Sequence, residues 1–197
     1  MDKLNKLSEV LSKRGFDIEI FQSSEKAAER IYEMVKGATV GLGSSMTLEK
    51  SGLLKNIDSS AKNVFRHSPG IAGQDERNAL TSDFYLTSAN AVSMDGHMVN
   101  IDGTGNRVAA TCFGPKRVVY LVGKNKITET LDKALQRAKI TAVKLASYFN
   151  RKTPCVKTGK CEDCLSLECV CSITVIHRKK PNGLKMSVFL INEDIGL

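Results

Sequence analysis

An alternation of strand-like and helix-like segments constrains the fold of this chain more than any other feature. The run FDIEIF (16–21) is followed by Ala27, Ile31 and Val35 at helical spacing, and then by ATVGLG (38–43), which has the pattern of a buried strand. Repeated strand–helix units predict an α/β fold with a largely parallel sheet flanked by helices. A length of 197 residues with 42% hydrophobic composition is enough for one core, so we expect a single domain over 1–197.

The rest of the chain continues this alternation. We expect a helix in QDERNALTS (74–82), one long strand in DFYLTSANAVSM (83–94), a strand in RVVYLVG (117–123) and an amphipathic helix from Ile127 to about Phe149. Near the end, two strands flank Pro181-Asn182-Gly183, a sequence that favours a tight turn. This pattern predicts a C-terminal β-hairpin.

Charge and composition narrow the class of partner. The net charge is +8 and the pI is about 9.2, which favours anionic ligands. The charges are scattered and aromatic residues make up only 6%, without a recognition-helix or aromatic–basic RNA-binding motif, so we expect no nucleic-acid binding. The sequence has neither a secretory signal pattern nor an apolar run of about 18 residues, so we expect a cytoplasmic protein that does not enter a membrane.

Two glycine-containing loops are candidates for an anion site. In the first, Gly41 and Gly43 end a strand, and we expect a helix to begin near the hydroxyl residues Ser44, Ser45 and Thr47. The backbone N–H groups at the start of that helix could bind an anion together with these hydroxyl groups. The alternative is an ordinary turn in which Ser44 or Ser45 caps the helix. The spacing and the missing lysine exclude a P-loop.

The second loop lies in NIDGTGNRVAA (100–110). Its glycines, Gly103 and Gly105, would let the backbone approach a ligand, and Arg107 could pair with a phosphate or carboxylate. The alternative is a polar loop in which Asn106 caps a helix. If the strands bring both loops together, they frame one pocket for an anionic small molecule, and Asn90 is expected to face it.

Candidate acid–base residues lie close to the second loop. Asp95, His97 and Asp102 could exchange protons with a bound ligand. Asp95 is also explained as a turn residue, because Asp-Gly is favoured in tight hairpins, and His97 as a surface or core histidine. We expect Cys112 to be a small buried side chain.

The segment 153–172 is rich in cysteine. Cys155, Cys161, Cys164 and Cys171 give a C-x5-C-x2-C-x6-C pattern, with Cys169 left over. In a reducing compartment such a set more often binds metal than forms disulfides, and four thiolates suit either a 4Fe–4S cluster or zinc. The alternative is a reduced loop without metal, or one clipped by a disulfide after oxidation.

Several segments taken together resemble a known family. GLGSSMTLEKSGLL, SANAVSMDGHMVNIDGTGNRVAA, GPKRVVYLVGKNKI, TPCVKTGKCEDC and VFLINEDIGL, spread from about Leu4 to Leu197, resemble the LUD-domain family of lactate-utilisation proteins. The resemblance implies a Rossmann-like fold similar to the NagB, ribose-5-phosphate isomerase and CoA-transferase group. It also implies a component of, or accessory to, the oxidation of L-lactate to pyruvate, beside iron–sulfur protein subunits.

The resemblance leaves other functions open. Related folds hold sugar phosphates, CoA or folate against a G-x-G-S-S/T loop, which corresponds to Gly41, Gly43, Ser44 and Ser45 here. The glutamate that CoA transferases use as nucleophile has no counterpart, so acyl transfer is not expected. One alternative is an enzyme acting on a phosphorylated sugar, nucleotide or folate with Asp95 or Asp102 as acid–base group. Another is a non-catalytic binding subunit, and a homo-oligomer also stays open.

Overall fold

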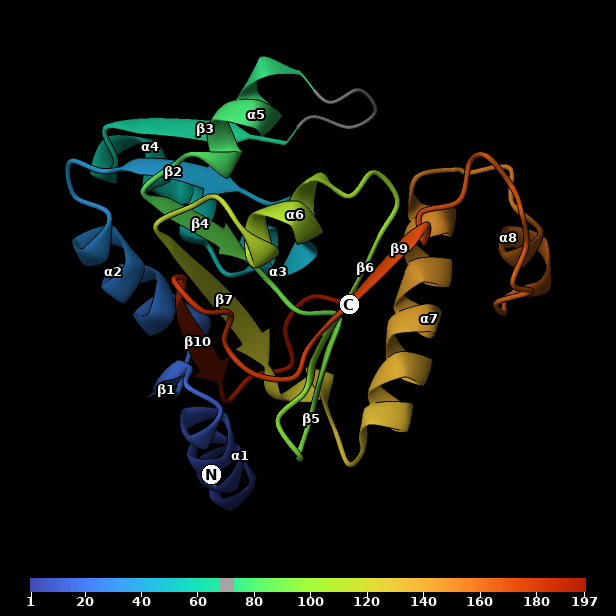
Figure 1. The fold of residues 1–197 in the computed structure, drawn as a ribbon, viewed down its shortest axis with the longest axis horizontal. Helices are drawn as coiled ribbons and strands as arrows, with labels where there is room; N and C mark the ends of the chain where they lie inside the picture. Colours follow the sequence, from blue (N-terminus) through green and yellow to red (C-terminus); the bar gives the residue numbers. More distant parts are fainter. Residues whose placement is uncertain (68–72) are drawn as a thin grey trace.

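A computed structural model of the protein describes residues 1–67 and 73–197. In this part of the chain, six strands form a main sheet in which every pairing is parallel (Figure 1). Their order across the sheet is β1 (Asp17–Phe21), β10 (Lys185–Ile191), β7 (Arg117–Gly123), β4 (Phe84–Thr87), β2 (Thr39–Leu42) and β3 (Asn63–Arg66). The expected parallel α/β sheet is confirmed.

The central strand β7 shows why the sheet needs cover on both faces. Val118, Tyr120 and Val122 belong to one hydrophobic core, whereas Val119 and Leu121 belong to the core on the opposite face. Successive side chains of a strand point to opposite faces, so a strand that is apolar throughout is stable only between two apolar layers.

Helices supply those layers. One face of the main sheet is covered by α2 (Ser24–Met34), α3 (Met46–Lys50), the 3-10 turn η1 (Leu53–Lys55) and α4 (Ile57–Ser60). The other face packs against α1 (Asp2–Lys13), α5 (Gln74–Leu80) and α6 (Asn106–Cys112). The sequence marks these helices locally: the N-cap Ser23 accepts a hydrogen bond from the backbone N–H of Lys26 at the start of α2.

A second, smaller sheet lies between the main sheet and the long helix α7 (Leu131–Tyr148) (Figure 1). Its strand order is β8 (Ile127–Thr128), β5 (Ala91–Ser93), β6 (Met98–Asp102) and β9 (Ile173–His177). Ala134, Ala138 and Ala142 of α7 pack against Val99 and Ile101 of β6. The short helix α8 (Pro154–Thr158) follows α7 and leads into the cysteine-rich segment.

One predicted strand is divided into two in the structure. The run DFYLTSANAVSM is not one strand: β4 ends at Thr87 in the main sheet and β5 begins at Ala91 in the small sheet. At the break, the Ser88 hydroxyl donates to the carbonyl oxygen of Leu121 at 2.6 Å. This contact satisfies a backbone acceptor of β7 where the chain leaves the main sheet.

The predicted C-terminal β-hairpin is wrong. The turn at Pro181-Asn182-Gly183 exists, with φ +77° at Gly183, but β9 pairs with β6 whereas β10 lies between β1 and β7. β10 is buried from Met186 to Ile191 and so requires the middle of a covered sheet, whereas the more exposed β9 forms an edge.

The long helix starts later than expected. α7 begins at Leu131, where the N-cap Thr130 accepts a hydrogen bond from the backbone N–H of Lys133, and Ile127 and Thr128 form β8 instead. Among the described residues, no helix is both long enough and apolar enough to cross a membrane.

Candidate functional site

A cavity of about 510 Å³ lies where the carboxyl ends of the main-sheet strands meet the small sheet. Strands β2, β3, β4 and β7 are each followed by residues that line it, as expected for a site in a parallel sheet. Its polar lining includes Ser44, Thr47, His67, Ser88, Asn90, Asp102, Asn106, Arg107 and Lys126. The two glycine loops therefore do meet at one pocket.

The first loop serves partly as a turn. Ser45 caps α3, since its hydroxyl accepts a hydrogen bond from the backbone N–H of Thr47 at 3.2 Å. Gly41 and Gly43 do not line the cavity. A Cβ at Gly43 would lie 2.9 Å from the Tyr85 hydroxyl and 3.3 Å from Cδ of Arg107, so this glycine gives Arg107 room to approach.

The second loop is organised by Asp102. Its Oδ1 accepts hydrogen bonds from the backbone N–H groups of Thr104 and Gly105, both at 3.0 Å. Its Oδ2 lies 3.5 Å from Nε of Arg107, so the two side chains form a mostly buried ion pair, and this oxygen has no hydrogen-bond partner among the residues that the structure describes. Gly103 lines the cavity, whereas Gly105, with φ +92°, begins α6 and does not. Asp102 thus has a structural role in addition to its place in the cavity wall.

Arg107 is fixed by groups of the small sheet. Its guanidinium donates to the carbonyl oxygen of Ile101 at 2.5 Å, to Oδ1 of Asn100 at 3.1 Å and to Oδ1 of Asn90 at 3.4 Å. Asn90 therefore contributes to the cavity by holding Arg107 as well as by lining it.

His67 and Asn106 form a further polar contact in the cavity. The Asn106 side-chain amide donates to Nδ1 of His67 at 3.1 Å, so Asn106 does not cap α6, for which Gly105 is the N-cap. The Tyr85 hydroxyl lies 3.4 Å from the same ring. Burial lowers the pKa of His67, so it is mainly neutral at pH 7. The sequence analysis did not single out His67, which directly follows β3.

Lys126 is the functional candidate that the sequence prediction missed most clearly. It is 4% exposed, and its Nζ donates to Oγ1 of Thr47 at 2.6 Å, to Oγ of Ser88 at 2.8 Å and to the carbonyl oxygen of Ala89 at 3.1 Å. All three acceptors are uncharged. Burial, together with the neighbouring guanidinium groups of Arg137 and Arg107, lowers the pKa of Lys126 to about 7.

The charged side chains in and near the cavity differ in how far they are buried. The carboxylates of Glu49 and Glu168 are exposed at the rim, and the buried Asp102 is already paired with Arg107. Lys126 and the partly buried Arg137 make no ion pair with a carboxylate in the described part of the chain. Because buried charges interact more strongly than exposed ones, the charge of Lys126 acts on the cavity more strongly than the charges of the carboxylates at the rim.

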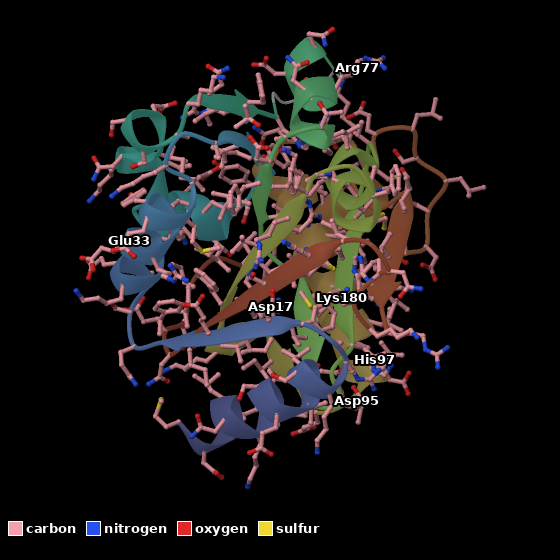
Figure 2. All side chains as sticks on the ribbon, turned by 60° about the vertical axis from the view of Figure 1, so that its left-hand side comes forward. Asp17, Glu33, Arg77, Asp95, His97 and Lys180 are labelled. Atoms are coloured by element: carbon pink, nitrogen blue, oxygen red, sulfur yellow. The ribbon has the colours of Figure 1, made fainter. Side chains whose placement is uncertain are left out.

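Asp95 and His97 lie apart from this cavity. They sit in the turn between β5 and β6, where Nδ1 of His97 is 2.9 Å from Oδ1 of Asp95, and neither lines the cavity. Figure 2 shows them side by side near α1. The structure therefore brings Asp102, but not the other two acid–base candidates, to the glycine loops.

The cysteines of segment 153–172 meet at a second cavity of about 450 Å³. It is lined by Cys155, Cys161, Cys164, Cys169 and Cys171, all free thiols. In residues 1–67 and 73–197, no three His, Cys, Asp or Glu side chains are close enough to hold one metal ion. The expectation for Cys112 is wrong: it is exposed on the last turn of α6, with its sulfur 4.0 Å from Nε2 of His177.

Comparison with known proteins confirms the resemblance. The LUD domain model matches residues 4–191, which is most of the chain. A solved structure described as a DUF162 family protein from Deinococcus radiodurans, at 1.70 Å resolution, is similar with a TM-score of 0.58 and 14% identity over 96% of both chains. At this identity the likeness supports the fold alone. No curated protein matches in sequence. Because the LUD domain model matches nearly the full length of this chain, the chain belongs to the LUD-domain family.

Proposed function

We propose that the cavity between the glycine loops binds a small organic anion, a 2-hydroxy or 2-oxo carboxylate such as L-lactate or pyruvate. In this proposal the protein is a component of, or accessory to, the oxidation of L-lactate to pyruvate, beside iron–sulfur protein subunits. Membership of the LUD-domain family supports the class of ligand. One observation carries the argument for an anion: Lys126 is a buried lysine whose amino group contacts only uncharged hydrogen-bond acceptors.

A buried cation without a counter-ion is unfavourable, because burial removes water that would otherwise stabilise the charge. A bound carboxylate would supply that counter-ion. Charge-assisted hydrogen bonds contribute roughly 1.5–3 kcal/mol each, so one or two of them are enough for a measurable affinity.

A second cation strengthens this argument. Arg151 lines the same cavity, and its Nε is buried without a hydrogen-bond partner among the described residues. Buried donors normally find an acceptor, so an unpaired guanidinium nitrogen beside a cavity is the kind of group that a ligand oxygen satisfies. Hydroxyl groups of Ser44 and Thr47 offer partners for the hydroxyl or keto oxygen of the ligand.

Titration calorimetry with four probes tests the proposal. L-lactate and pyruvate carry the carboxylate, lactamide has nearly the same shape without the charge, and inorganic phosphate represents the phosphorylated ligands of the alternative function. We expect the wild type to bind L-lactate or pyruvate at least tenfold more tightly than lactamide.

A pair of lysine variants locates the binding site. Lys126→Met should lose at least tenfold in affinity for the carboxylate. Lys124→Met is the matched control, since Lys124 belongs to the same 3-10 turn but is exposed, and it should bind like the wild type. Equal binding of lactamide, or an equal loss in both variants, would contradict the proposal. Binding of phosphate alone would favour a phosphorylated ligand instead.

A further inference from the structure

The five cysteines of segment 153–172 line one cavity from two sides. Cys155 lies in the first turn of α8, which ends at Gly159 with φ +73°, and the chain then folds back over the cavity. The segment 159–172 contains neither helix nor strand and contributes the other thiols, those of Cys161, Cys164, Cys169 and Cys171. The cavity lies between this segment, α8 and α7.

The returning segment is attached at two points. Nζ of Lys139 on α7 lies 3.1 Å from Oδ1 of Asp163, and the backbone N–H of Lys152 donates to Oε2 of Glu168 at 2.8 Å. These contacts hold the segment against the middle of α7 and the loop that follows it. Thiols up to 16 positions apart in the sequence, from Cys155 to Cys171, therefore face one space.

We propose that this cavity is a metal centre that holds a 4Fe–4S cluster through the thiolates of Cys155, Cys161, Cys164 and Cys171. Four cysteine thiolates are the usual ligand set of such a cluster, and each binds a different iron, so the four sulfurs need not meet at one metal ion as they would around zinc. Each thiol releases its proton when its sulfur binds iron. The proposal concerns cluster binding alone and does not depend on the anion in the neighbouring cavity.

The size and lining of the cavity favour a cluster over zinc. A zinc ion holds its sulfurs at about 2.3 Å, so four ligands would close around it with little space left. A core of four iron and four sulfide ions needs more room, and the cavity measures about 450 Å³. One wall is apolar, formed by Ala142, Val143 and Ala146 of α7, and such a wall limits the access of water to a cluster.

The metal centre and the anion cavity share a wall. Ile101, Cys169 and Val170 line both spaces. Gly103 of the second glycine loop packs against this wall, since a Cβ there would lie 3.0 Å from Cα of Val170 and 3.2 Å from the carbonyl oxygen of Cys169. The backbone of Cys169 therefore belongs to the partition, and its sulfur lies 3.3 Å from Oγ of Ser172, so we leave Cys169 out of the ligand set.

The test is the iron and acid-labile sulfide content of the full chain, purified and reconstituted without oxygen, with its visible and electron paramagnetic resonance spectra. We expect about four iron and four sulfide per chain. Single Cys→Ser variants of Cys155, Cys161, Cys164 and Cys171 should each lose most of the cluster. Cys169→Ser should keep it.

Cys112→Ser is the matched control, because Cys112 is also a free cysteine but lies outside the cavity, and it should keep the full iron content. Circular dichroism of each variant checks that the rest of the fold is intact. Alkylating the thiols of folded wild type before reconstitution should also prevent cluster formation. Absence of iron and sulfide after reconstitution, or one zinc per chain without sulfide, would overturn the proposal, as would an equal loss in Cys112→Ser.

Discussion

Nζ of Lys126 lies 2.6 Å from Oγ1 of Thr47, although the two residues are 79 positions apart in the sequence. The hydrogen bond joins the turn after β7 to the first turn of α3. Both side chains are buried and both line the anion cavity. The hydrogen bond thereby fixes the amino group of Lys126 at the wall of this cavity.

The first prediction is that affinity for a carboxylate depends on pH through Lys126. The pKa of Lys126 is lowered to about 7 in the free protein, and a bound anion raises it by favouring the charged form. Below pH 7 the lysine is already charged, so affinity should be constant. Above pH 7 binding must take up a proton, so affinity should fall by up to about tenfold per pH unit.

Calorimetric titrations with pyruvate between pH 6 and 9 measure this dependence. Buffers of different ionisation enthalpy should also reveal proton uptake on binding at pH 8. Lys126→Met should remove the pH dependence, whereas Lys124→Met should retain it. A wild-type affinity that does not change over this range would rule out Lys126 as the titrating partner of the anion.

The second prediction concerns stability without ligand. The pKa of Lys126 is about 7 in the folded protein and about 10.4 in an unfolded chain, so between these values the unfolded state binds more protons. The free energy of unfolding should therefore rise with pH in this window, by at most about 1.4 kcal/mol per unit from this group. Below pH 7 the full penalty of the buried charge is present.

Urea denaturation of wild type and Lys126→Met at pH 7, 8 and 9 isolates this contribution, because the other titrating groups are shared. As pH rises, the free energy of unfolding of the wild type should increase relative to that of Lys126→Met. A constant difference would mean that Lys126 keeps an ordinary pKa.

The parallel sheet could be predicted from the sequence because its strands are apolar on both faces and alternate with amphipathic helices. The sheet that each of the last two strands joins could not be predicted in the same way. A Pro-Asn-Gly turn reverses the chain locally, but it does not decide whether β9 and β10 pair with each other. That choice follows from burial: β10 completes the main sheet, and β9 adds an edge to the small one.

Part of the candidate site could be predicted from the sequence, and part of it depends on contacts between distant residues. Searching the carboxyl ends of strands found both glycine loops, and with them Arg107 and Asp102. Lys126 also follows a strand, but a lysine in a loop is usually exposed. Its burial depends on Thr47 and Ser88, which are 79 and 38 positions away. Contacts at such separations arise only from the assembled fold.

A third prediction concerns Gly43. A Cβ there would lie 2.9 Å from the Tyr85 hydroxyl, 3.0 Å from Oγ1 of Thr87 and 3.3 Å from Cδ of Arg107. Gly43→Ala should therefore displace Arg107, lower the free energy of unfolding by roughly 1–3 kcal/mol and weaken pyruvate binding severalfold.

Gly37→Ala is the comparison for this variant. Gly37 has φ +70° with nothing within 4 Å of an added Cβ, so the substitution should lower stability by about 1 kcal/mol and leave binding unchanged. Unfolding curves and calorimetry of both variants give the result. Unchanged binding in Gly43→Ala would separate this glycine from the anion cavity.

A fourth prediction separates anion binding from acid–base catalysis at Asp102. Asp102→Asn keeps an oxygen for the backbone N–H groups of Thr104 and Gly105 but removes a buried negative charge. Affinity for pyruvate should stay equal or rise severalfold, since repulsion of the carboxylate is removed. Asp102→Ala should be less stable by roughly 1–3 kcal/mol, because it leaves both donors without that acceptor.

Asp102→Asn also tests the alternative in which Asp102 transfers protons. In that case any turnover of a phosphorylated substrate should disappear while the substrate still binds. A loss of pyruvate affinity of tenfold or more in a folded Asp102→Asn protein would contradict the expectation for the anion cavity, because it would mean that the Asp102 carboxylate supports binding through its ion pair with Arg107.

A fifth prediction compares two histidines. His97 lies in the β5–β6 turn, paired with Asp95 at 2.9 Å, whereas His67 lines the anion cavity and accepts a hydrogen bond from Asn106 at 3.1 Å. His97→Gln should leave pyruvate affinity within twofold of wild type, because the substituted side chain does not reach the cavity. His67→Gln should weaken it severalfold, since Asn106 loses the partner that orients it. Calorimetry on both variants, with circular dichroism as a check on folding, gives the comparison. A tenfold loss in His97→Gln alone would assign the Asp95–His97 pair to the functional site and require the cavity to extend to that turn.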